Sequence, residues 1–167
     1  MIKVIRSIKE LDFSQIFAVY EESICQDGKC RYPYEPDGVQ ILLAQQELYS
    51  SWEVFFQDKT AVCALWVVDG HYCAALRLER YCDGYLLNSL ETAPDARRKG
   101  YATALVKALI KLLKEKRPIK LYSHIDKHNH ISITVHRSCG FYKIMDYAVY
   151  LDGSVLHSSD TYICDIE

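Results

Sequence analysis

Three cationic side chains, a glycine and two small residues stand close together in this chain of 167 residues, where a helix is expected to begin. They follow an apolar run that ends near Thr92 and precede an amphipathic run over residues 104–113. The first turn of a helix offers unpaired backbone N–H groups and the positive end of the helix dipole, and small residues let an anion approach closely. Arginine and lysine add charge-assisted hydrogen bonds to phosphate oxygens. We therefore expect a phosphate-binding turn formed by Arg97, Arg98, Lys99, Gly100, Tyr101, Ala102 and Thr103.

A second group of polar residues has the spacing of one helical face. Asn129, Ser132 and His136 stand at positions i, i+3 and i+7, which places them on the same side of a helix. Ile131 and Val135 fall on another side, where they suit the core. The segment therefore predicts a short helix that presents an amide, a hydroxyl and an imidazole together.

Both groups need a framework, which the periodicity of apolar residues outlines. It predicts strands over residues 3–5, 61–68, 72–78, 85–92, 119–125, 141–151 and 161–166, and helices over 8–24, 39–56, 98–116 and 131–139. Residues 26–38 are expected to form a loop, the Asp-Gly pairs at 69–70 and 83–84 to form turns, and Pro118 to end its helix. The order predicts an α+β, or α/β layered, fold on one mixed sheet, with residues 1–167 as a single domain.

The two polar groups match motifs of a known family. Pro94, Arg97, Gly100 and Ala102 follow a strand and precede a helix, and Asn129, Ser132, His136 and Gly140-Phe141 follow the next strand. Over residues 61–141 the chain resembles the GNAT-type N-acetyltransferase superfamily. The resemblance implies a mixed, largely antiparallel sheet of about seven strands, with helices on both faces and a splayed central pair of strands.

The resemblance also implies where a coenzyme would bind. Acetyl-CoA is expected between the strands over residues 85–92 and 119–125, with its diphosphate on the backbone N–H groups of residues 98–103. The pantetheine arm would pair with the backbone at Leu90 and Thr92, and Asn129 would hold its far end. The glycine-rich phosphate loop of nucleotide triphosphatases is absent, so that class is not expected.

Acetyl transfer to an amine needs a neutral nucleophile and a proton donor for the departing thiolate. An ammonium with a pKa of about 10.4 costs about 4.6 kcal/mol to neutralise at pH 7. His136 stands where many relatives have a tyrosine that acts as the acid, and an imidazole can do the same work. The alternative is a histidine that fills the space of the tyrosine and bonds a neighbour.

Three residues are candidates for the base. His124, five positions before Asn129, is favoured because some relatives have a glutamate there. Glu91, at the end of the strand expected to line the acetyl group, is its rival, and Glu79 is a third candidate. The alternative for His124 is a structural histidine on a face of the sheet.

The first two helices, their loop and the closing strands are expected to face the acceptor. Carboxylates and aromatic rings in that region suit a cationic amine, through ion pairing and cation–π contact. We expect Tyr32, Tyr34, Glu35 and Tyr150 to bind it, although these are equally read as surface acids and partly buried tyrosines. A small amine or polyamine, an aminoglycoside-like compound and a peptide N-terminus all fit.

Composition narrows the partners and the compartment. A net charge of −2 gives no general attraction to nucleic acid or to an anionic membrane. Seven cysteines, an odd number, favour free thiols in a reducing compartment, and no apolar run is long enough for a signal peptide or a membrane span, so a cytoplasmic protein is expected. The Cys and His spacings match no zinc pattern, so no metal is expected. If the chain assembles, a homodimer is expected, because dimers are the commonest oligomers of soluble proteins.

The expected function is direct transfer of an acetyl group from acetyl-CoA to a primary amine of a small molecule or peptide. The alternative is a non-catalytic acyl-CoA-binding domain of the same fold, acting as a sensor or scaffold. Histidine instead of tyrosine at position 136 is the feature that favours this alternative.

Overall fold

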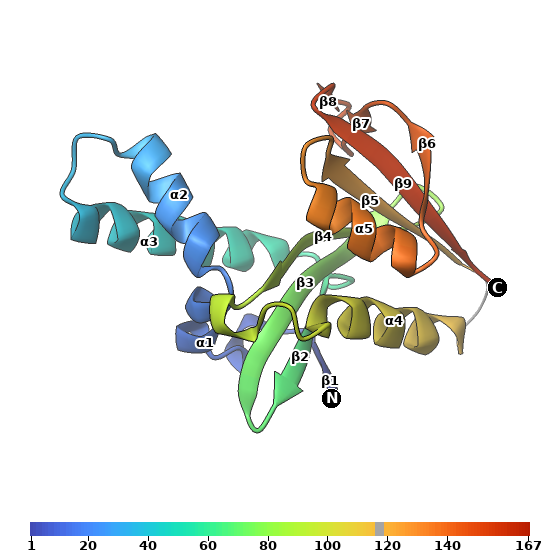
Figure 1. Ribbon diagram of the computed structural model, residues 1–167, viewed down its shortest axis with the longest axis horizontal. Coiled ribbons are helices and arrows are strands. Elements are labelled where there is room, and N and C mark those ends of the chain that lie inside the picture. Colours follow the sequence, from blue (N-terminus) through green and yellow to red (C-terminus); the bar gives the residue numbers. More distant parts are fainter. Residues whose placement is uncertain (116–118) are drawn as a thin grey trace.

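A computed structural model describes residues 1–115 and 119–167, which are built on a seven-stranded sheet (Figure 1). The strands of this sheet are β1 (Ile2–Ile5), β2 (Val62–Val68), β3 (His71–Tyr81), β4 (Gly84–Thr92), β5 (Ile119–Asp126), β6 (Tyr142–Met145) and β9 (Ser159–Ile166). The helices are α1 (Phe13–Val19), α2 (Glu21–Arg31), α3 (Asp37–Phe55), α4 (Tyr101–Lys114) and α5 (His130–Ser138), with 3-10 turns η1 (Ile8–Glu10) and η2 (Pro94–Ala96). A separate hairpin consists of β7 (Ala148–Val149) and β8 (Val155–Leu156).

The strand order of the main sheet is β1-β2-β3-β4-β5-β9-β6. Neighbouring strands are antiparallel except β4 and β5, which are parallel. The predicted mixed, largely antiparallel sheet is therefore confirmed.

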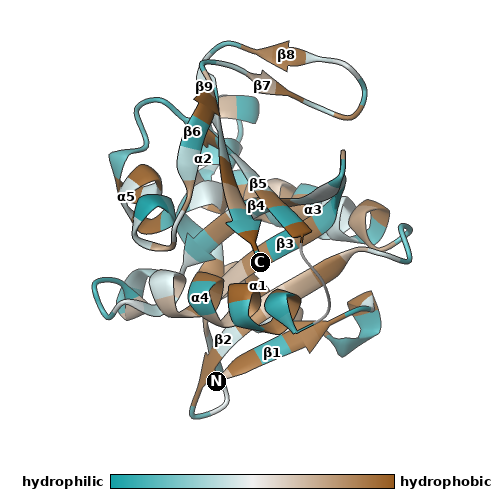
Figure 2. Cartoon of the chain, turned by 90° about the vertical axis from the view of Figure 1, so that its right-hand side faces the viewer, coloured by the Kyte–Doolittle hydropathy of each residue, from teal (hydrophilic) through white to brown (hydrophobic). Residues whose placement is uncertain are grey.

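Helices cover both faces of this sheet (Figure 1). The face that packs against Trp52 of α3 is called the α3 face, and α1 and α2 lie on it as well. The face that packs against Leu105 of α4 is called the α4 face, and α5 lies there. Figure 2 shows that α4 carries both apolar and polar residues. Its apolar residues Leu105, Val106, Leu109 and Leu113 are buried against the sheet. Lys107, Lys111 and Lys114 of this helix are exposed.

β4 and β5 run side by side for only part of their length. Their parallel pairing ends at Leu87 and Ser123, although β4 continues to Thr92 and β5 to Asp126. Just beyond this pair, a bulge at Ser89, whose φ is +51°, accompanies a shift in the β3–β4 register. The two strands therefore diverge after Leu87 and Ser123, which confirms the splayed central pair.

The bulge is held from the α3 face. Tyr20, between α1 and α2, donates its hydroxyl to the carbonyl oxygen of Ser89 at 2.6 Å. Its ring packs edge-on against Trp52, and burial raises the pKa of the Tyr20 phenol well above its ordinary value. The phenol therefore remains a hydrogen-bond donor to the bulge.

The two Asp-Gly pairs have different structures. Asp69 and Gly70 have positive φ, 49° and 82°, and form the predicted turn between β2 and β3. At the second pair the residue with positive φ is Cys82, at 47°, so this turn lies one residue earlier than predicted. Gly84 is already in β4, and a Cβ there would lie 2.0 Å from the carbonyl oxygen of Lys120. This glycine lets β4 approach β5 closely.

The N-terminal helices also differ from the prediction. The single helix expected over residues 8–24 is divided into η1, α1 and α2, with Tyr20 between the last two. The loop expected over residues 26–38 is confirmed only over residues 32–36, because α2 continues to Arg31 and α3 begins at Asp37. Gly28 lies within this helix, at a place where α2 approaches α3 closely. A Cβ there would lie 2.7 Å from the carbonyl oxygen of Gln40 on α3, so only glycine fits. The glycine marks a close helix contact and not a loop.

Other boundaries shift by smaller amounts. α4 begins at Tyr101 and not at residue 98, and its predicted end at Lys116 and Pro118 lies outside the described residues. The strand predicted over residues 141–151 is interrupted between β6 and β7.

α5 is turned differently from the prediction. Ile131, expected in the core, is 81% exposed, whereas His136 is 1% exposed and is the residue that faces inward. The prediction that Ile131 suits the core is wrong, because the inward side of this helix meets a polar group on β5.

Candidate active site

The turn before α4 presents a run of backbone N–H groups. Arg98 and Gly100 have φ of +59° and +77°, so the chain passes twice through the left-handed region before the helix begins. Among the described residues, the first N–H after Arg97 that donates to a protein acceptor is that of Ala104, which binds the Gly100 carbonyl oxygen at 2.9 Å. A Cβ on Gly100 would meet no atom within 4 Å. Free N–H groups, the helix dipole and open space together suit an anion such as a diphosphate.

The cationic side chains of this turn differ in their contacts. Arg97 donates to Glu22 of α2 at 2.6 Å and to the carbonyl oxygen of Thr92 at 3.4 Å. Arg98 is exposed, and Lys99 lines a cavity beside the turn. Arg97 and Thr92, both predicted to contact the coenzyme, therefore contact each other, and Arg97 links the turn to α2.

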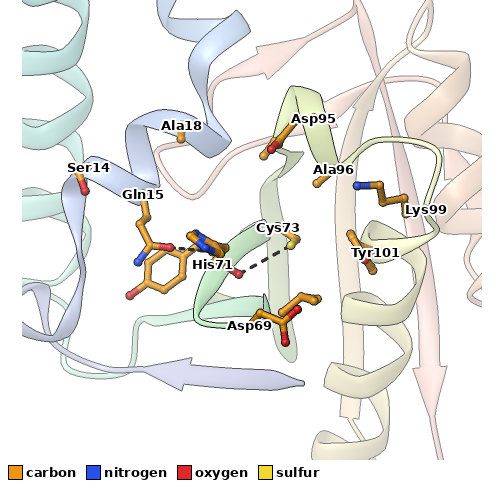
Figure 3. Close-up of a pocket in the computed structure, with 13 residues that line it drawn as sticks. Ser14, Gln15, Ala18, Asp69, His71, Cys73, Asp95, Ala96, Lys99 and Tyr101 are labelled. Atoms are coloured by element: carbon orange, nitrogen blue, oxygen red, sulfur yellow. Dashed lines mark hydrogen bonds between the residues drawn. The ribbon is translucent and has the colours of Figure 1, made fainter.

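The cavity has a volume of about 330 Å³ and lies between α1, the β2–β3 turn and the start of α4 (Figure 3). Lys99 and Tyr101 contribute to its wall from the turn, and Asp95 contributes from η2. On the α1 side, Gln15 accepts a hydrogen bond from the backbone N–H of Tyr72 at 2.8 Å. The turn therefore borders open space at Lys99 and Tyr101.

Asn129 and Leu90 stand on opposite sides of the strand divergence. Asn129 caps α5, since its side-chain oxygen accepts a hydrogen bond from the Ser132 N–H at 3.0 Å. Leu90 packs partly into the α4-face core, at a part of β4 that pairs with no described residue on the β5 side. The backbone of β4 beyond Leu87 is thus an open strand edge, to which an extended ligand can add.

His136 has protein partners at both ring nitrogens. Nδ1 lies 2.8 Å from the carbonyl oxygen of Ser132, so Nδ1 carries the proton, and Nε2 lies 3.0 Å from the Ser123 hydroxyl. Burial lowers the pKa of His136, although the Ser132 contact opposes this change. The ring is therefore neutral at pH 7 and accepts a hydrogen bond from Ser123. Sequence reasoning missed Ser123, whose signal was a polar residue between the core residues Leu121 and Ile125.

His124 lies on the opposite face of β5, among aromatic rings instead of hydrogen-bonding groups. Its ring packs edge-on against Tyr81 and Tyr150, with centroid distances of 5.3 and 5.0 Å. Both ring nitrogens are buried and have no hydrogen-bond partner among the described residues. Burial lowers the pKa of His124, so the ring is neutral at pH 7 and has a free lone pair. His124 and Tyr150, both predicted site residues, are thus brought together.

The two candidate carboxylates lie on the α3 face of β3 and β4. Glu91 accepts a hydrogen bond from Ser23 of α2, and burial raises the pKa of Glu91. Glu79 accepts a hydrogen bond from the side-chain amide of Asn88, and burial raises its pKa as well. Both carboxylates therefore have hydrogen-bond donors on the α3 face, Ser23 and Asn88, which were not found by sequence reasoning.

The other predicted acceptor residues lie elsewhere. Tyr32, Tyr34 and Glu35 belong to the connection between α2 and α3, at the outer end of this helix pair (Figure 1). Tyr34 is 98% exposed, and the Tyr32 hydroxyl donates to Glu47 of α3. The structure does not bring these three residues to the strand divergence, because α2 carries their loop outward.

Within residues 1–115 and 119–167, no group of three or more His, Cys, Asp or Glu side chains is arranged to hold a metal ion. In the same ranges, no helix combines the length and apolar character required to cross a bilayer.

Comparison with known proteins assigns the family. Residues 21–141 match the acetyltransferase (GNAT) family. The match covers most of the chain, and the chain belongs to this family. No curated protein sequence matches it.

Solved structures share the fold along the whole chain. The PaiA N-acetyltransferase from Thermoplasma acidophilum, in complex with coenzyme A, has a TM-score of 0.68 and 15% identity, covering 99% of each chain. The ribosomal-protein-S18-alanine N-acetyltransferase from Escherichia coli has a TM-score of 0.63 and 18% identity, covering 100% of this chain and 95% of the other. Aminoglycoside 6'-acetyltransferase type Ii has a TM-score of 0.66 and 15% identity, covering 100% and 97%.

The acyl donor of this family is acetyl-CoA, and the chain has features that fit it. The free N–H groups of residues 98–103 suit its diphosphate, and the open edge of β4 suits an extended amide-containing arm.

Proposed function

We propose that this chain transfers an acetyl group from acetyl-CoA directly to a primary amine of a small molecule or peptide. The observation that carries the proposal is the left-handed turn at residues 98–100, with its free N–H groups, beside two parallel strands that part after Leu87 and Ser123. An anion site and an open strand edge at one end of a cleft suit the two halves of a coenzyme A molecule. This arrangement would present the thioester at the divergence.

In this proposal the turn and β4 hold the coenzyme. The N–H groups of residues 98–103 donate to the diphosphate, with Arg98 and Lys99 as nearby cations. The backbone at Leu90 and Thr92 pairs with the pantetheine arm, and the side-chain amide of Asn129, whose oxygen already caps α5, donates at its far end. Arg97 contributes by linking the turn to α2 through Glu22.

His124 acts as the base in this proposal. Its neutral ring has an unbonded nitrogen on the α3 face, beside the point where the strands part. It accepts a proton from the attacking amine, directly or through water. Glu91 and Glu79 raise the local negative potential on the same face, which attracts an ammonium ion before it loses its proton.

His136 acts on the other face of β5, through Ser123. As negative charge develops on the departing sulfur, Nε2 takes up a proton from solvent and becomes a donor to the Ser123 oxygen, and the Ser123 hydroxyl is then free to donate toward the sulfur. The single tyrosine of many relatives is replaced here by a two-residue relay.

Two further observations support an amine acceptor and a reducing compartment. Two similar structures are named as acetyltransferases for a ribosomal-protein alanine and for an aminoglycoside. All seven cysteines carry free thiols, which suits the cytoplasm.

The test is release of free coenzyme A thiol from acetyl-CoA in the presence of phenethylamine, spermidine, kanamycin or a peptide with an N-terminal alanine. Release that depends on one of these amines supports the proposal. A rise in melting temperature with acetyl-CoA but no release across the panel would instead favour a non-catalytic acyl-CoA-binding domain. No change in melting temperature would contradict coenzyme binding itself.

A further inference from the structure

Asn88 and His124 are the first residues on β4 and β5 beyond the last parallel pair, Leu87–Ser123. Leu87 lies in the α4-face core, and Ser123 faces α5, so the next residue on each strand points to the α3 face. Paired strands lie about 4.8 Å apart, and these two start to separate here. The two side chains therefore stand on either side of the point where the strands separate.

The side chain of Asn88 is fixed at one end and unpaired at the other. Its amide nitrogen donates to a carboxylate oxygen of Glu79, which lies on the neighbouring strand β3. A carboxylate accepts hydrogen bonds, so this contact turns the Asn88 carbonyl oxygen away from Glu79. That oxygen is buried and has no hydrogen-bond partner among the described residues. A buried acceptor without a donor is uncommon and calls for a partner.

His124 supplies the second unpaired acceptor. Both of its ring nitrogens are buried without partners in the described part of the chain, and a neutral imidazole has one accepting nitrogen. One acceptor from β4 and one from β5 thus lie on the same face of the sheet, where the two strands begin to separate. The group that satisfies both has two donor hydrogens on one atom, as a neutral primary amine has. A secondary amine has only one.

We propose that Asn88 positions the acceptor amine, and that Glu79 acts as a positioning residue by orienting Asn88. The inference rests on the proposed function. The Asn88 oxygen accepts one N–H of a primary amine, and the second N–H points to His124. The amine nitrogen forms a bond to the acetyl carbon of acetyl-CoA, and the carbon–sulfur bond breaks. The proton from nitrogen passes to His124 and from there to solvent, and the sulfur leaves as the thiol after taking a proton from Ser123, which is replaced from solvent through His136.

The experiment compares phenethylamine with N-methylphenethylamine, because Tyr81 and Tyr150 offer aromatic surfaces beside His124. Asn88→Leu keeps the size of the side chain but removes the acceptor oxygen. We expect kcat/KM for phenethylamine to fall about 10- to 100-fold, since a buried amine N–H then loses its partner. For N-methylphenethylamine the fall should be several times smaller. The KM for acetyl-CoA should not change.

Two variants of Glu79 separate orientation from folding. Glu79→Leu leaves Asn88 free to rotate and should lower kcat/KM for phenethylamine, whereas Glu79→Gln keeps an acceptor for the Asn88 amide and should restore most of the loss. The dissociation constant of phenethylamine in the presence of free coenzyme A, measured by calorimetry, should weaken in Asn88→Leu in parallel with kcat/KM.

Equal selectivity between the two amines in wild type and Asn88→Leu would overturn the inference, as would an unchanged dissociation constant. A wild-type protein that binds phenethylamine without releasing thiol would contradict the proposed function. In that event the calorimetric comparison alone decides the role of Asn88.

Discussion

A histidine ring lies against each face of β5, and the two rings differ in their hydrogen bonding. On the α4 face, His136 has both nitrogens occupied, by Ser123 and by Ser132. On the α3 face, His124 has neither nitrogen occupied, although its ring packs between two tyrosines. Burial lowers the pKa of both, so the difference between them lies in hydrogen bonding and not in charge.

This difference indicates which face is complete without a ligand. A buried ring with two partners is fixed in one tautomer and acts on other groups only through those partners. A buried ring without partners is stabilised when a ligand supplies them. In the proposed function the α4 face is thus organised in advance, whereas the α3 face is completed by the acceptor amine.

The largest effect is expected at the incomplete site. His124→Phe keeps the aromatic contacts with Tyr81 and Tyr150 but removes both nitrogens. We expect kcat with a primary amine to fall about 100-fold or more, because the base is lost. The wild-type kcat should decrease as pH falls through the His124 pKa, which lies below 6.5, and this decrease should vanish in the variant. An unchanged kcat and pH profile would assign the base role to another group.

Replacing the bonded histidine should change both stability and turnover. His136→Phe leaves the buried Ser123 hydroxyl without its acceptor, and we expect the free energy of unfolding to fall by about 1–3 kcal/mol. Turnover should also fall, while the dissociation constant of acetyl-CoA stays close to that of wild type. Denaturant unfolding and calorimetry measure these quantities.

Ser123→Ala provides the matched control for that variant. If Ser123 and His136 act as a pair, the double variant should lose less turnover than the sum of the two single losses. Fully additive losses, or unchanged turnover in His136→Phe, would contradict the relay.

Stability should depend on pH through both rings. Each histidine has a lowered pKa in the folded protein, so between that pKa and 6.5 the unfolded chain binds more protons than the folded chain. The free energy of unfolding should therefore fall as pH drops below 6.5 and be fully retained above it. Urea unfolding from pH 7.5 to 5 checks this, and His136→Phe or His124→Phe should each flatten the curve. A steeper curve in either variant would contradict the assignment.

The smallest effect is expected at the bulge that opens the cleft. Tyr20→Phe removes the hydrogen bond to the Ser89 carbonyl oxygen and keeps the ring contact with Trp52. We expect a loss of about 1 kcal/mol in unfolding free energy and a higher KM for acetyl-CoA, because the shape of β4 is less well fixed. Trp52→Phe, which leaves the hydroxyl in place, is the control. An unchanged KM in Tyr20→Phe would limit this phenol to a packing role.

The sequence predicted the parts of the site that depend on local geometry. The turn at residues 97–103 was predicted because cations, a glycine and small residues at a helix start have a direct physical meaning, and its binding of a diphosphate stays a prediction. The contact between Ser132 and His136 was found because their spacing defines a helical face. In both cases the chemistry depends on neighbours within one turn of chain.

The parts that were missed depend on contacts between distant segments. Tyr20 and Ser89 are 69 residues apart, and no spacing rule joins them. The orientation of α5 was predicted wrongly because hydropathy favoured Ile131, whereas Ser123 on another strand lets His136 take the buried position. The predicted acceptor loop was misplaced because Gly28 suggested a break where α2 continues.

The most direct test of the account is the crystal structure of the protein with acetyl-CoA. The account predicts that the diphosphate accepts hydrogen bonds from the N–H groups of residues 98–103, and that the thioester lies beyond Leu87 and Ser123, between His136 on one face and His124 on the other. A coenzyme bound elsewhere, or a turn whose N–H groups remain empty in that crystal, would contradict it.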